Sequence, residues 1–93
     1  MCKFNLEALE FDHIVEFTSD TTLFVAAREN GKGSLRLFLI NESTGNAYTR
    51  NGRADSWEQI YGSDRESIIA RIIAAKNSNI PTYKVNGNGG EPH

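Results

Sequence analysis

The chain has 93 residues, of which 39% are hydrophobic and 24% charged, and its net charge at neutral pH is −2. This length predicts a single domain over residues 1–85, followed by a flexible glycine-rich tail over 86–93. No apolar run approaches the ~20 residues of a membrane span, so no membrane association is expected. The only cysteine, Cys2, allows no internal disulfide, which favours a cytoplasmic protein.

The first third of the chain predicts two strands. Residues 11–18 alternate between apolar and polar side chains, and a tight turn follows at Ser19 and Asp20. Residues 21–29 form the second strand, whose inward side chains are Leu23, Val25 and Ala27. Before these strands, residues 4–10 fit either a short helix or an extended lead.

Residues 34–40, with the sequence SLRLFLI, predict the central strand. Its one face carries Leu35, Leu37 and Leu39, and the other carries Arg36, Phe38 and Ile40. Because the leucine face is wholly aliphatic, we expect it to form the floor of the core. Asparagine and glycine at 30–33 and the loop 42–45 indicate hairpins on either side, and residues 46–50 form a fourth, short strand.

Helix signals dominate the next part of the chain. Ser56 and Gln59 have the spacing of a capping box, and Gly62 has the position of a stop, which predicts one helical turn over 56–62. Ser63 and Glu66 repeat the capping box and predict the start of a longer helix. The apolar stripe of that helix is Ile68, Ile69, Ile72, Ile73 and Ala75. The helix ends near residues 77–81, and residues 81–85 form a last extended piece.

These elements predict an α+β fold. It consists of an antiparallel meander of three to four strands with one C-terminal helix packed on one face, and a short N-terminal helix as an option. In this arrangement the leucines of the central strand pack against the isoleucines of the helix.

No catalytic motif, phosphate-binding loop or metal-ligand spacing occurs in the sequence, so no catalytic residue, cofactor or metal ion is expected. His13 alternates with Phe11, Val15 and Phe17, which favours a structural histidine. Cys2 has no evident activating base nearby in the sequence.

The second face of the sheet is the candidate binding surface, unless the N-terminal segment covers it. One helix covers only one face, and apolar side chains with arginine on the other are typical of a protein interface. The candidate residues are Phe24, Arg28, Arg36, Phe38 and Ile40. We therefore expect a small non-enzymatic protein-binding module, such as an accessory regulator or inhibitor of a larger protein or complex encoded by a phage or mobile element.

The alternative function is nucleic-acid binding through the basic segment 32–53, which offers cations for phosphates and an aromatic ring for stacking. The residues concerned are Lys32, Arg36, Tyr48, Arg50 and Arg53. A pI near 5.6 is against this interpretation. A homodimer formed through the open sheet face or the edge of the fourth strand is compatible with either function.

Overall fold

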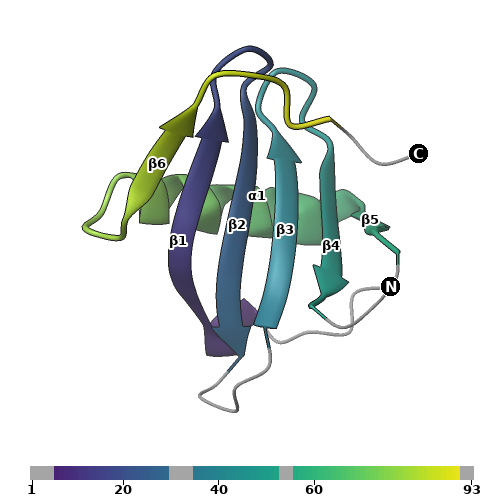
Figure 1. The fold of residues 1–93 in the computed structure, drawn as a ribbon. Coiled ribbons are helices and arrows are strands. Elements are labelled where there is room, and N and C mark those ends of the chain that lie inside the picture. Colours follow the sequence, from purple (N-terminus) through teal and green to yellow (C-terminus); the bar gives the residue numbers. More distant parts are fainter. Residues whose placement is uncertain (1–5, 30–34, 53–55, 91–93) are drawn as a thin grey trace.

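A computed structural model describes residues 6–29, 35–52 and 56–90 (Figure 1). Six strands form one sheet in the order β5-β4-β3-β2-β1-β6, and helix α1 (Gly62–Lys76) lies across one face. The strands are β1 (Leu9–Phe17), β2 (Thr22–Glu29), β3 (Leu35–Asn41), β4 (Ala47–Asn51), β5 (Glu58–Ile60) and β6 (Thr82–Val85). All neighbouring pairs are antiparallel except β1 and β6, which run parallel. The α+β class is confirmed, with two strands more than the largest meander expected.

The predicted meander corresponds to β1–β4, and its β3–β4 turn is held as the sequence suggests. The side-chain oxygen of Asn41 accepts hydrogen bonds from the backbone N–H groups of Ser43 (2.9 Å) and Thr44 (3.0 Å). This is an asparagine-centred turn of the kind that competes with regular structure at strand ends. The predicted hairpin loop at 30–33 lies outside the described residues.

The prediction of a helical turn over 56–62 is wrong, because the middle of this segment, Glu58–Ile60, forms the edge strand β5. Ala47 of β4 pairs with Ile60, whose side chain is only 1% exposed. Alternation brings Ile60 to the helix side of the sheet and Gln59 to the other side. Pairing with β4 and burial of Ile60 therefore outweigh the local capping signal at Ser56.

The prediction of a capping box at Ser63 is also wrong. Helix α1 begins at Gly62, where φ is +64°, and its N-cap residue Tyr61 makes no side-chain capping hydrogen bond. A positive φ is accessible to glycine at little cost, so Gly62 turns the chain from β5 into the helix. At the other end, α1 stops at Lys76 before Pro81, as expected.

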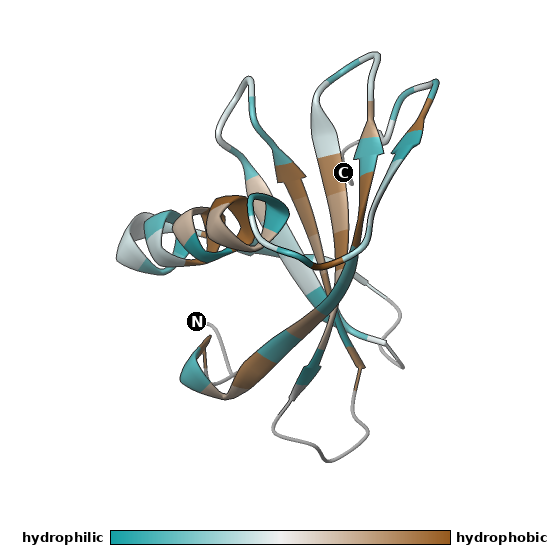
Figure 2. Ribbon diagram, turned by 90° about the vertical axis from the view of Figure 1, so that its left-hand side faces the viewer, coloured by the Kyte–Doolittle hydropathy of each residue, from teal (hydrophilic) through white to brown (hydrophobic). Residues whose placement is uncertain are grey.

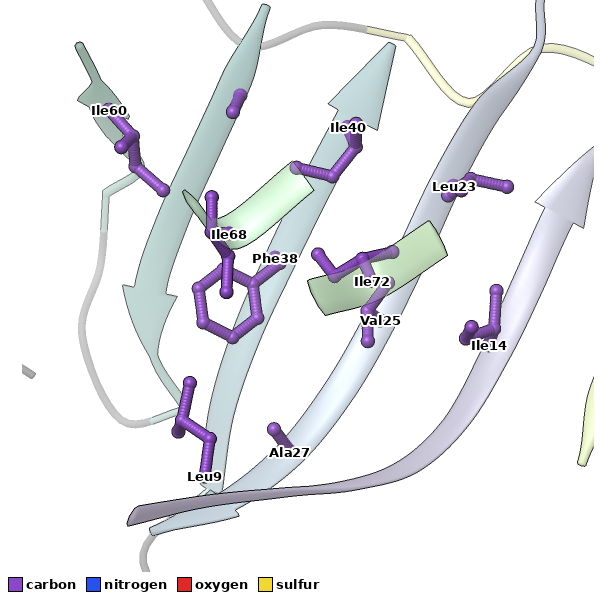
Figure 3. Packing of buried hydrophobic residues seen from close by; sticks show 11 residues of the cluster. Leu9, Ile14, Leu23, Val25, Ala27, Phe38, Ile40, Ile60, Ile68 and Ile72 are labelled. Carbon is purple, nitrogen blue, oxygen red and sulfur yellow. The ribbon is translucent and has the colours of Figure 1, made fainter. Parts of the chain in front are cut away.

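The assignment of the β3 faces is reversed relative to the sequence prediction. Val25 pairs with Phe38 and Leu23 pairs with Ile40, and directly opposed side chains lie on the same face of a sheet. Phe38 and Ile40 are therefore in the core with the helix, both 0% exposed, and Leu35 lies on the opposite face. Figure 3 shows the Phe38 ring beside Ile68.

The isoleucine stripe of α1 faces the sheet as predicted. Ile68 and Ile72 are fully buried, and Ile69, Ile73 and Ala75 are partly buried against the same cluster. A 3₁₀ turn, η1 (Leu6–Ala8), precedes β1 and lies on the same side of the sheet as α1 (Figure 2). The described part of the N-terminal segment therefore packs on the helix side and does not cover the other face.

Residues 86–90 form a strap that follows β6 and crosses the β1–β2 turn (Figure 1). Asp20 is its anchor: one carboxylate oxygen accepts hydrogen bonds from the N–H groups of Gly89 (3.0 Å) and Gly90 (3.4 Å), and the other accepts one from Thr22 (3.1 Å). A Cβ on Gly89 would stand 2.6 Å from a methyl group of Thr22, so only glycine fits there. This part of the predicted tail is thus held against the domain.

We expect Phe38→Ala to lower the free energy of unfolding by ~3–5 kcal/mol, because it leaves a cavity under α1. Leu35→Ala, on the exposed face of the same strand, should change it by no more than ~0.5 kcal/mol. Chemical denaturation of both variants measures the difference. Should Phe38→Ala not fold at all, Ile72→Val, at an expected ~0.5–1.5 kcal/mol, replaces it. Equal losses on the two faces would contradict the assignment.

A second prediction concerns the strap. Burial acts to raise the pKa of the Asp20 carboxyl, but hydrogen bonds from Thr22, Gly90 and Gly89 lower it, and the net pKa is below its usual value. The stability from the ionised carboxylate is therefore complete above the unfolded-state pKa of about 3.9 and is lost as pH falls through the lower folded-state pKa. Wild type should be more stable than Asp20→Asn at neutral pH, and this difference should disappear in acid.

The amide proton shifts of Gly89 and Gly90, followed during the same titration, provide a local measurement. They should move when Asp20 is protonated and when Asn replaces it. The matched control is Asp64→Asn in the first turn of α1, which should leave both amides unchanged. Glycine shifts that do not respond to Asp20→Asn would show that the strap is held by other contacts.

Candidate functional site

The sheet face opposite α1, called the open face below, carries two central rows of paired side chains. The first row crosses all six strands and consists of Tyr83, Val15, Phe24, Leu39, Tyr48 and Gln59. The second row consists of His13, Ala26, Leu37 and Arg50. A β-bulge between Phe11 and His13 brings His13 to this face, while Phe11 stays with the core.

The rows form a largely apolar surface with exposed positions at its margins. Leu37 and Leu39 are only 7% and 5% exposed, whereas Leu35 and Tyr83 are 42% and 56% exposed. In its row Leu39 lies between the rings of Phe24 and Tyr48. Aromatic side chains therefore shield the inner aliphatic residues, although the only described α-helix lies on the opposite face.

Trp57, which immediately precedes β5, joins this surface. Its ring meets the ring of Phe24 edge to face, with centroids 6.5 Å apart and an interplanar angle of 83°. The guanidinium carbon of Arg50 lies 5.0 Å from the centroid of the same ring, within the range of a cation–π contact. The three side chains form a cluster that links β2, β4 and β5 across the open face.

Sequence reasoning did not assign Trp57 to the site, because it assigned residues 56–62 to a helical turn. The available signal was the alternation of apolar and polar residues. Over residues 57–60 this alternation is weaker than in the longer strands, because Trp57 and Gln59 do not differ clearly in polarity from Glu58 and Ile60. A three-residue strand offers too few alternating positions to be distinguished from one helical turn.

Arg50 is the only arginine or lysine in the two central rows. Its Nε is buried and has no hydrogen-bond acceptor in the described part of the chain. Arg28, near the end of the face, is paired with Asp12 at 3.3 Å, and Asp12 also contacts the Nδ1 of His13 at 3.1 Å. The two central rows contain no carboxylate, so Arg50 gives the middle of the open face a positive character.

The predicted protein-binding residues divide between the two faces. Phe24 and Arg28 lie on the open face, as expected, and Arg28 is exposed. Phe38 and Ile40 lie under α1 with no exposed surface, and Arg36 is on the helix side by its pairing with Ala27. Because of the register of β2 and β3, Leu35, Leu37 and Leu39 occupy the face that was expected for Phe38 and Ile40.

The predicted nucleic-acid set is divided as well. Tyr48 and Arg50 share the open face, whereas Arg36 lies on the other side of the sheet. Lys32 and Arg53 lie outside the described residues. The fourth strand, whose edge was considered for dimerisation, is internal, because β4 pairs with both β3 and β5.

Within residues 6–29, 35–52 and 56–90, no three histidine, cysteine or acidic side chains lie close enough to hold a metal ion. No helix in those ranges is long and apolar enough to cross a membrane.

Comparison of this chain with models of known protein families, with curated proteins and with solved structures gives no match to any of them. The open face itself is therefore the basis for a functional proposal.

Proposed function

We propose that this chain is a non-enzymatic protein-binding module that docks a partner protein on its open face. The observation that carries the proposal is an apolar and aromatic surface that runs from β6 to β4 on the side of the sheet away from α1, with Trp57 beside it. Apolar surface of this extent on a small domain is typical of an interaction site. A cytoplasmic accessory regulator or inhibitor, of phage or mobile-element origin, remains the expected context.

The composition of the open face fits a protein interface in two respects. Aromatic side chains and arginine are enriched at the centre of such interfaces, and here Trp57 contacts both Phe24 and Arg50. Leu37 and Leu39 are already shielded by their neighbours, so the free domain exposes mainly the outer parts of the aromatic rings and the marginal residues Leu35 and Tyr83. Such a surface tolerates water and still offers apolar contact area to a partner.

Nucleic-acid binding is the second candidate, favoured by one observation. Tyr48, Trp57 and Arg50 share a sheet face, and rings with arginine on a sheet form stacking platforms for single strands. Against it, phosphate binding needs several cations, and Arg50 is the only arginine or lysine in the two central rows.

The proposal predicts that the partner can be trapped covalently from the open face. A photo-crosslinking phenylalanine derivative at Tyr83, which is 56% exposed, should capture a protein in cells, identified by mass spectrometry. The same group at Ala74, exposed on α1, is the matched control and should not capture that protein. Capture of the same protein from both positions would contradict an interface on the open face.

Affinity for the purified partner then provides the quantitative test. The double variant Leu35→Glu/Tyr83→Glu should weaken binding at least about tenfold, since it introduces charges into the apolar margin of the face. Its melting temperature should stay close to that of wild type because both side chains are exposed. Ala74→Glu should leave affinity unchanged. Labelled single-stranded DNA and RNA at low salt test the second candidate, which requires binding that falls steeply as salt rises.

A further inference from the structure

We infer that the open face selects a polypeptide segment in which a single carboxylate is flanked by apolar side chains, and that Arg50, held on Trp57, binds the carboxylate. This inference rests on the proposed protein-binding function and specifies the chemistry of the partner.

The first step of the argument is the state of Arg50. Its side chain is half-buried, its guanidinium lies on the Trp57 ring at 5.0 Å, and its buried Nε has no acceptor among the described residues. The two central rows hold no carboxylate, so the charge of this partly desolvated cation is not balanced by a neighbouring side chain in either row. A partner carboxylate near its Nη groups would supply the missing charge in the form that arginine binds best.

The second step is that the site is already organised for such a contact. Trp57 is held edge to face against Phe24, and its ring in turn limits the positions open to the guanidinium. A depression beside this contact is lined by Arg50, Trp57 and Ser56 and by residues from the helix side of the sheet, Arg36 and Glu58 among them. Arg36 and Glu58 already have interactions of their own, which leaves Arg50 as the group that a ligand on the open face would meet.

The third step concerns what surrounds the cation. Leu37 is opposite Arg50 on β3, and Leu39 and Tyr48 form the adjacent row. Leu37 and Leu39 are already only 7% and 5% exposed, so a ligand that reaches Arg50 lies mainly on the half-buried rings of Tyr48 and Trp57. It gains free energy there only if it brings apolar groups. A single carboxylate among apolar side chains matches this arrangement.

The charges of the open face also argue against two other ligands, a second copy of the chain and a nucleic acid. A second copy of the chain would present the same central rows, which contain no carboxylate for Arg50. A nucleic acid would place one phosphate per nucleotide on a face whose second arginine, Arg28, is already paired with Asp12. Charge complementarity thus favours a polypeptide with few carboxylates.

The experiment is selection from a displayed library of random linear peptides on wild type, on Arg50→Gln and on Arg71→Gln. Arg71 is exposed on α1 and is the matched control. Wild type and Arg71→Gln should enrich peptides in which Asp or Glu stands beside Leu, Ile, Phe or Trp. Selection on Arg50→Gln should lose the acidic residue. Circular dichroism melting checks that each variant is folded.

Synthetic versions of the selected peptides give the magnitude. Trp57 is the only tryptophan of the chain, so its emission reports directly on the site. Replacing the acidic residue by its amide should weaken binding to wild type about tenfold, the size of one charge-assisted hydrogen bond. The same replacement should have no effect on binding to Arg50→Gln, and Arg50→Lys should show an intermediate effect.

The outcomes separate this inference from the proposal on which it rests. Peptides that perturb the amide signals of the open face but show no preference for a carboxylate would overturn the role of Arg50 and leave the protein-binding function standing. If no selected peptide perturbs the open face, both fail. Binding of oligo-dT to wild type that is lost in Arg50→Gln, and that outcompetes the peptides, would overturn the inference in favour of nucleic acid.

Discussion

The register between β2 and β3 is the constraint on which the rest of this structure depends. Val25 opposes Phe38, and Leu23 opposes Ile40, so these four side chains must lie on one face of the sheet. That face receives the isoleucines of α1 and becomes the core. The same register leaves Leu35, Leu37 and Leu39 on the other face, because a shift of one residue would exchange every side chain of β3 between the two faces. The register of β2 and β3 thus determines which residues form the core and which form the candidate interface.

The remaining strands extend both faces together. The edge strand β5 adds Ile60 to the core and brings Trp57 and Gln59 toward the open face. At the other edge, β6 returns after α1 and pairs parallel to β1, which aligns Tyr83 with Val15. Helix α1 carries the chain from β5 at one edge of the sheet to β6 at the other edge, and it covers the core on the way. Since the single described α-helix covers one face, widening the sheet to six strands enlarges the open face as much as the core.

Local patterns in the sequence were sufficient for the elements and insufficient for their pairing. Alternation located β1–β4 and the 3.6-residue period located α1, because both depend on neighbouring residues only. In β3 both sets of alternate residues contain large apolar side chains, so the pattern does not show which set faces the helix. One set is Leu35, Leu37 and Leu39, and the other is Arg36, Phe38 and Ile40. That choice depends on the register with β2. The assignment of inward residues in β2 was right, and the observed register, in which Val25 is opposite Phe38, places Phe38 inward as well.

The candidate site was predicted only in outline, again because local patterns do not show how the strands pair. A sheet with one covering helix leaves one face open, and Phe24 was assigned to it from the phase of β2. Trp57 depends on β5, whose three residues form a strand only because β4 is beside them. Its contact with Phe24 joins residues 33 positions apart in the chain, and no local pattern encodes it.

The aromatic residues of the open face are not needed to form the core. Phe24 and Tyr48 lie on the side of the sheet away from Ile68 and Ile72, so polar side chains at these positions would leave the packing under α1 unchanged. The face is also bounded at both ends: the strap places Gly89 against Phe17 and Thr22, and the Asp12–Arg28 ion pair lies toward the opposite end. Between the strap and this ion pair, the cluster around Trp57 combines apolar surface with Arg50, which has no carboxylate partner in the two central rows. The proposed recognition of a partner would use both features.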